Sequence, residues 1–129
     1  MREMIVQYDD PAEIERLQRD YSERLCMLAA AKKAAIQAGI PALHRLVEIA
    51  DRDSGQALRV RCVLLSLYSS YRFPFPLVTL RSLDKEILDD CLAVINLDAS
   101  VRAKEINEYI DNGRAIWERW ATTTDWHEC

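Results

Sequence analysis

The sequence predicts an all-α fold, a compact bundle of about five to six helices with a long N-terminal helix. Residues that favour helices (Ala, Leu, Glu, Arg and Lys) are plentiful, whereas the 129 residues include only three glycines and four prolines. Apolar side chains recur at helical spacing, and no stretch shows sustained period-two alternation. A chain of this length is expected to form one domain. Its expected parts are a long helix over residues 10–39, a helical core over 41–121 and a tail over 122–129.

The first helix has clear boundary signals. Asp10 is a suitable N-cap, Pro11 suits the first helical position, and Glu13 completes a capping-box pattern. Gly39 is a suitable residue for the C-terminal end. The apolar positions between these ends form a stripe that suits either packing along the domain or pairing with a second copy. These positions are Ile14, Leu17, Tyr21, Leu25 and Leu28.

The middle of the chain predicts two more helices. Pro41 is expected to begin a second, shorter helix. A third helix, from about Gly55 to Tyr71, has apolar residues on most of its surface and is expected to be the central helix of the bundle. The segment FPFPLV, residues 73–78, excludes further helix because proline lacks an N–H and disfavours helix in the residue before it.

The segment RDSGQALRV, residues 52–60, is interpreted as the junction between the second and third helices. Ser54 or Asp53 is expected to cap the third helix. Gln56 and Arg59 are expected to connect neighbouring segments.

The last third of the chain predicts shorter helices. A fourth helix is expected after Ser82 or Asp84, and NLDAS, residues 96–100, is expected to end it. A fifth helix is expected to begin near Ser100. After a turn at residues 111–113, a short last helix carries two tryptophans that are expected to seal the core. The final TTTDWHEC is expected to be a loosely held tail.

No catalytic, cofactor or metal pattern stands out. The chain contains only two histidines, His44 and His127, and neither has a ligand-like partner one helical turn away. The acids of DKEILDD, residues 84–90, spread around a helix and are expected to be solvated. We therefore expect no enzyme activity, cofactor or metal. The four cysteines form no CxxC pair and are Cys26, Cys62, Cys91 and Cys129.

Cellular location is inferred from the chain start and from the apolar runs. MREMIVQYDD turns acidic within ten residues, which is unlike a secretory leader. The apolar stretches are too short to span a bilayer, so no membrane partner is expected. The expectation is a cytoplasmic protein with reduced thiols.

Charge is distributed unevenly around a net −4. Residues 1–31 contain four basic and seven acidic side chains, residues 32–72 seven and three, and residues 73–129 six and eleven. The acidic ends suit a basic, nucleic-acid-binding protein surface. The basic middle suits nucleic acid, unless its arginines pair with acids of neighbouring helices.

Candidate binding residues follow from this charge pattern. A tryptophan in the polar tail has little reason to be buried and is a further candidate to anchor a partner. The predicted partner-binding residues are Glu13, Glu15, Glu23, Asp89, Asp90 and Trp126. The predicted nucleic-acid-binding residues are Arg52, Arg59 and Arg72.

Two segments carry a recognisable pattern: LHRLVEIADRDSGQALRVRCVLLSLYSSY and LRSLDKEILDDCLAVINL. They resemble a family of small all-helical proteins of unknown function encoded on bacterial plasmids, phages and integrative conjugative elements. The family's glycine-rich loop is replaced here by RFPFPLV, and its pattern does not include the long first helix. The matching residues are Arg52, Asp53, Ser54, Gly55, Gln56, Arg59, Val60, Leu83, Asp84, Asp89, Asp90, Leu92, Ala93 and Val94.

The resemblance implies an accessory protein of a mobile element. Such elements carry small acidic proteins that disable host defences. The leading expectation is a non-enzymatic protein-binding protein, an anti-CRISPR inhibitor that docks on a CRISPR effector complex and blocks or dismantles it. One alternative is a nucleic-acid-binding accessory or regulatory protein that uses the basic middle. Another is a homodimeric structural or antitoxin-like module paired through the first helix.

Overall fold

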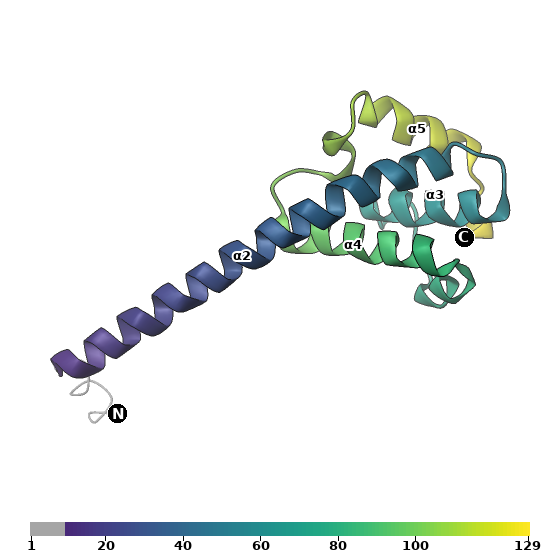
Figure 1. Cartoon of the computed structure of the whole chain (residues 1–129). Helices are drawn as coiled ribbons and strands as arrows, with labels where there is room; N and C mark the ends of the chain where they lie inside the picture. Colours follow the sequence, from purple (N-terminus) through teal and green to yellow (C-terminus); the bar gives the residue numbers. More distant parts are fainter. Residues whose placement is uncertain (1–9) are drawn as a thin grey trace. The chain divides into compact units, whose positions relative to one another are not determined.

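The computed structural model describes residues 10–129, and every regular element there is helical (Figure 1). This confirms the predicted all-α fold with a long N-terminal helix. Residues 1–9, on which the expectation about a secretory leader rests, lie outside the described residues. The elements are α2 (Pro11–Ala50), α3 (Gly55–Tyr68), η2 (Leu77–Ser82), α4 (Lys85–Val101), η3 (Ile106–Tyr109), α5 (Gly113–Thr123) and η4 (Trp126–Glu128), where η marks a 3-10 helix.

The expected break between the first two helices is wrong, because α2 is one continuous helix of 40 residues. Gly39 is buried inside it, and a Cβ atom there would lie only 2.6 Å from Cβ of Leu97 on α4. Glycine therefore serves close helix packing here instead of ending the helix. Pro41 interrupts the backbone hydrogen bonding but is itself exposed. The fully buried Leu43 and Leu46 that follow it favour continuation of the helix.

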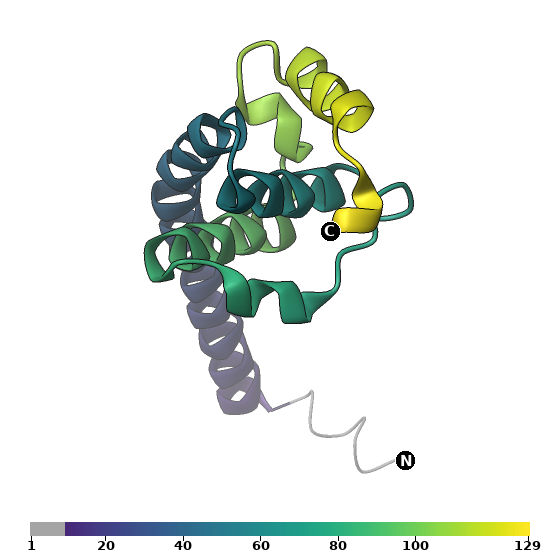
Figure 2. The ribbon, with the colours of Figure 1, turned by 90° about the vertical axis from the view of Figure 1, so that its right-hand side faces the viewer.

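The chain divides into two compact units, Met1–Ala34 and Ala35–Cys129. The hydrophobic core lies in the second unit, where α3 contacts α4, α5 and η3. Figure 2 shows α3 between α4 and α5, so its predicted central place in the bundle is confirmed. That both units form a single domain stays a prediction.

The start of α3 is capped as expected. Ser54 is the N-cap, and its Oγ accepts a hydrogen bond from Ala57 N at 3.1 Å. The Gln56 side chain donates to the carbonyl of Ser82 at 2.9 Å and accepts from Asp84 N at 3.1 Å. Gln56 thus connects the start of α3 to the start of α4, as predicted.

A second connection at this junction comes from Arg61, which sequence reasoning did not single out. Its guanidinium donates to the carbonyl oxygens of Ala50 at 2.7 Å and Arg52 at 3.0 Å. These bonds satisfy carbonyl groups at the C-terminal end of α2, where no intrahelical donor remains. Arg59, to which we assigned this role, is half-buried on α3.

Two predicted boundaries after α3 need correction or refinement. The helix ends at Tyr68 instead of extending to Tyr71. Residues 73–76 lie outside any helix, as expected from their prolines, but Leu77 and Val78 begin the 3-10 helix η2, which corrects the prediction for these two residues. Phe73 is buried against the core.

The predicted end of the fourth helix is also wrong. α4 continues through residues 96–100 to Val101, because Leu97 within that stretch is fully buried and holds the helix on the core. Arg102 then adopts a left-handed backbone with φ 55°, which ends the helix. The expected fifth α-helix is only the short 3-10 helix η3.

The two tryptophans of α5 attach it to the core, as predicted. Trp117 is fully buried and its Nε1 donates to the carbonyl of Leu64 on α3 at 3.0 Å. Nε1 of Trp120 donates to Oδ1 of Asp51 at 3.0 Å. The two rings also contact each other, with centroids 4.8 Å apart.

The expectations of a loose tail and of reduced thiols are both wrong at the C-terminus. Cys129 forms a disulfide with Cys62 of α3, with 5.6 Å between the two Cα atoms. Oγ1 of Thr79 donates to the Cys129 carbonyl at 3.2 Å, and Thr124 is buried. The spacing of the cysteines in the sequence could not predict this disulfide, because the pairing depends on which segments the fold brings together.

The two free cysteines are expected to react very differently. Cys26 is exposed, whereas burial, assisted by the nearby Asp90 charge, raises the pKa of the Cys91 thiol to about 12. Iodoacetamide at pH 8 without reductant should therefore modify Cys26 in the native protein and Cys91 only after unfolding. Peptide mass spectrometry checks this. Alkylation of native Cys91 as fast as Cys26 would contradict the buried position.

Candidate protein-binding surface

Apolar side chains remain exposed along the part of α2 that lies in the first compact unit. The predicted helical stripe is present there, and we call its five residues the α2 stripe. Their exposed fractions range from about a third to about two thirds: Ile14 37%, Leu17 44%, Tyr21 64%, Leu25 49% and Leu28 58%.

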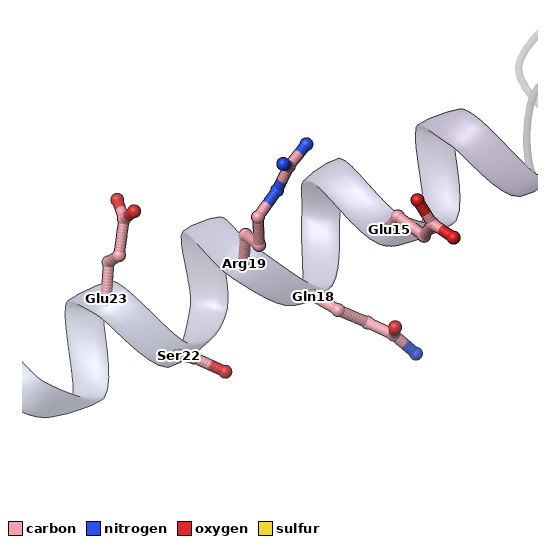
Figure 3. Close-up of a pocket in the computed structure, with 5 residues that line it drawn as sticks. All are labelled: Glu15, Gln18, Arg19, Ser22 and Glu23. Carbon is pink, nitrogen blue, oxygen red and sulfur yellow. The ribbon is translucent and has the colours of Figure 1, made fainter.

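The α2 stripe is narrow and continuous. At 100° per residue, its five positions fall within an arc of about 80° on the helix surface. The other side of the helix is polar, and Figure 3 shows its side chains spread over the outside of a single helix, without convergence on one point. An open hollow there is lined by Glu15, Gln18, Arg19, Ser22 and Glu23. From Ile14 to Glu23, α2 therefore has one apolar and one polar face, whereas farther along the exposed Met27 also lies outside the stripe.

An amphipathic helix normally buries its apolar face against another element. Single exposed apolar residues are ordinary on protein surfaces, but five in register on one helix form a contiguous patch, which is typical of an interaction site. The α2 stripe is therefore the strongest candidate binding surface of the molecule.

The three acids predicted on the first helix have different surroundings. Glu13 forms an ion pair with Arg16 one turn later. Glu15 and Glu23 are exposed and share the polar face of α2. Of the three acids predicted on the first helix, Glu15 and Glu23 are therefore the two that remain accessible to a partner.

The two acids predicted on α4 are both paired. Asp89 forms an ion pair with Lys85 of the preceding turn. Asp90 accepts two hydrogen bonds from the Arg45 guanidinium, each 2.9 Å long. Because Arg45 lies on α2, Asp90 connects two helices of the core.

Of the arginines predicted to bind nucleic acid, Arg72 forms an ion pair. Arg72 pairs with Glu118 of α5 at 3.0 Å, and the Tyr68 hydroxyl donates to the same carboxylate at 2.7 Å. The hydrogen bonds from Arg72 and then from Tyr68 lower the pKa of the Glu118 carboxyl. Arg52 is exposed and Arg59 is half-buried. The alternative interpretation, arginines paired with acids of neighbouring helices, thus holds for Arg72.

Trp126, the predicted anchor in the tail, is 42% exposed. Its ring stacks on His127 with the ring centroids 3.9 Å apart. A mainly apolar hollow of about 450 Å³ lies beside it, formed where the tail meets the proline-containing loop. Sequence reasoning missed this hollow, because its two halves lie far apart in the chain. The lining residues are Pro74, Phe75, Pro76, Trp126, His127 and Cys129.

Residues 10–129 contain neither a metal site nor a membrane-spanning helix. No group of three or more His, Cys, Asp or Glu side chains there is placed to hold a metal ion. Within the same residues, no helix combines the length and the apolar character that crossing a membrane requires. His44, weighed as a ligand, lies exposed on α2.

Comparison with known proteins assigns most of the chain to one family. Residues 40–125 match the model described as "Family of unknown function (DUF7673)". The matched region contains the C-terminal end of α2 and the elements α3 to α5, and it leaves out the α2 stripe. No curated protein and no solved structure matches the chain. The chain is therefore a member of this family of unknown function.

Proposed function

We propose that this protein is a non-enzymatic, protein-binding accessory protein of a mobile genetic element, and that the α2 stripe is its protein-binding surface. The observation that carries the proposal is the exposure of the α2 stripe. The helix that bears it is apolar on this face and polar on the opposite face. A helix of this kind is stabilised when the apolar face packs into a groove or against a second helix.

A protein fits this surface better than a lipid bilayer does. Helices that lie on membranes usually carry lysine and arginine on the polar face. The polar face opposite the stripe instead carries both signs, with Glu15 and Glu23 beside Arg16 and Arg19. Two carboxylates would be repelled by anionic headgroups, whereas they are compatible with a basic protein surface.

The finer form of the proposal is an anti-CRISPR inhibitor that docks on a CRISPR effector complex and blocks or dismantles it. Its support is the resemblance to a family found on mobile elements, together with the exposed acids Glu15 and Glu23. Effector complexes hold nucleic acid in positively charged channels, and acidic side chains complement such surfaces.

The experiment is affinity purification of the tagged protein from host bacteria, with nuclease treatment, followed by mass spectrometry. The test variant carries Leu17→Glu and Leu25→Glu on the stripe. The matched control carries Ser22→Glu and Ala30→Glu, which add the same charge at exposed positions outside the stripe. Recovery of a bound protein should fall about tenfold or more in the test variant, because an unpaired carboxylate would be buried in the contact.

The outcomes distinguish the general protein-binding proposal from its anti-CRISPR form. Nuclease-resistant recovery of effector subunits supports the anti-CRISPR form, and replacing Glu15 and Glu23 by lysine should then weaken it. If a different protein is recovered with the wild type and the control variant but not with the stripe variant, the protein-binding proposal is supported without its anti-CRISPR form. Equal recovery in the stripe variant and its control, or recovery of nucleic acid without protein, overturns it.

A further inference from the structure

We infer that the protein covering the α2 stripe is a second copy of this chain, paired antiparallel about a two-fold axis at Tyr21. This inference rests on the proposed function, because it takes the stripe to be a protein-binding surface and names the protein that covers it. Three observations support it: the spacing of the stripe, the charges that bound it, and the polar face left outside.

The spacing of the stripe is symmetric. Its successive positions are three, four, four and three residues apart, so the pattern reads the same in both directions from Tyr21. In an antiparallel pair centred there, Ile14 of one copy faces Leu28 of the other, and Leu17 faces Leu25. Each apolar side chain thus meets an apolar side chain, and the two Tyr21 rings meet on the axis.

Charges at the two ends of the stripe distinguish antiparallel from parallel pairing. Asp10 and Lys32 lie eleven residues before and after Tyr21. At 100° per residue, Lys32 points within about 20° of the Tyr21 direction and so lies on the stripe face. Asp10 directly precedes α2, and its side chain accepts a hydrogen bond from Ala12 N at the N-terminal end of the helix. Antiparallel pairing places Asp10 of one copy against Lys32 of the other, whereas parallel pairing opposes like charges.

The whole segment has the same charge asymmetry. Residues 10–23 contain five acidic and two basic side chains, whereas residues 24–34 contain three basic side chains and no acid. An antiparallel pair therefore places an acidic half against a basic half twice. This complementarity identifies a second copy as the occupant, since the two halves of one segment supply both partners.

The pairing leaves the polar face of α2 outside. At 100° per residue, Glu15 and Glu23 point at least about 120° away from the Tyr21 direction, so they keep their exposure for a further partner. The paired part of α2 spans residues 11–32, about 33 Å of helix. That is a small interface, so the dimer is expected to dissociate on dilution. The segment precedes the family match, which begins at residue 40.

Cysteine cross-linking tests both the pairing and its direction. All variants carry Cys26→Ser, which removes the exposed free thiol. Chains with Ile14→Cys and chains with Leu28→Cys, distinguished by size tags, are oxidised separately and as a mixture. The expected result is a disulfide between the two different chains, with a yield about tenfold or more above either variant alone. Chains with Ser22→Cys and Ala30→Cys, at exposed positions outside the stripe, serve as the control mixture and should cross-link poorly.

The first three of the following outcomes overturn the inference. Cross-links of each variant with itself indicate parallel pairing. A yield equal to that of the control mixture indicates random collision. If cross-linking fails while the stripe variant still loses a bacterial protein in affinity purification, the proposed function stands and a different protein covers the stripe. If the specific cross-link forms but no bacterial protein is recovered, the dimer stands without the proposed host target.

Discussion

Replacing Cys129 by serine is expected to lower the free energy of unfolding by about 4 kcal/mol under oxidising conditions. The residue forms the disulfide with Cys62, 67 positions earlier in the chain. A disulfide that closes so long a loop lowers the conformational entropy of the unfolded chain, and the expected loss of about 4 kcal/mol comes from that effect. The measurement is urea denaturation of both proteins without reductant, followed by circular dichroism.

Two controls isolate the disulfide. Replacing the exposed Cys26 by serine removes a free thiol and should leave the unfolding midpoint unchanged. With dithiothreitol, the wild-type midpoint should fall to that of the Cys129→Ser variant. Identical unfolding curves without reductant would show that the disulfide does not form or does not stabilise the fold.

Replacing Trp117 by alanine is expected to cost about 4 kcal/mol of unfolding free energy. Its side chain is fully buried where α5 meets α3. Alanine would leave a cavity and would also leave the Leu64 carbonyl without its indole donor. Urea denaturation at constant temperature measures the loss.

Trp126 provides the matched control for this substitution. It is 42% exposed, so its replacement by alanine should cost no more than about 1 kcal/mol. The loss of unfolding free energy for Trp117→Phe should lie between those of Trp117→Ala and Trp126→Ala. Phenylalanine keeps most of the side-chain volume but cannot donate the hydrogen bond to Leu64. A Trp117→Ala variant as stable as Trp126→Ala would contradict the buried contact between α5 and α3.

Local rules predict the fold class and several element boundaries. The 3.6-residue spacing identified the apolar face of the first helix, and the side chain of Ser54 caps α3 as its position before Gly55 indicates. Proline chemistry predicted that residues 73–76 are not helical, although α3 already ends at Tyr68. These signals lie within a few residues of the structure that they determine.

Features that depend on contacts between distant segments were not predictable. Gly39 has the pattern of a helix end, and only the structure shows that it instead allows close packing of α2 against Leu97. The disulfide between Cys62 and Cys129 joins segments whose proximity no spacing rule indicates. In both cases a tertiary contact outweighs the local preference.

In the candidate site, too, local features were predictable and contacts between distant segments were not. Periodicity predicts the α2 stripe, but only the structure shows that these side chains are exposed. The predicted acids could not be sorted from the sequence, because ion pairing depends on which helices are neighbours. Asp90 meets Arg45 across two helices, whereas Glu15 and Glu23 remain exposed.

The most direct test of an interface on the α2 stripe is the molar mass of the purified full-length protein, measured by light scattering over a range of concentrations. We predict twice the chain mass of 14.9 kDa at the highest concentrations and the monomer mass on dilution. Leu17→Glu should remain monomeric at every concentration, whereas the polar-face control Ser22→Glu should behave like the wild type. A monomer mass for all three proteins at every concentration would contradict self-pairing through the stripe.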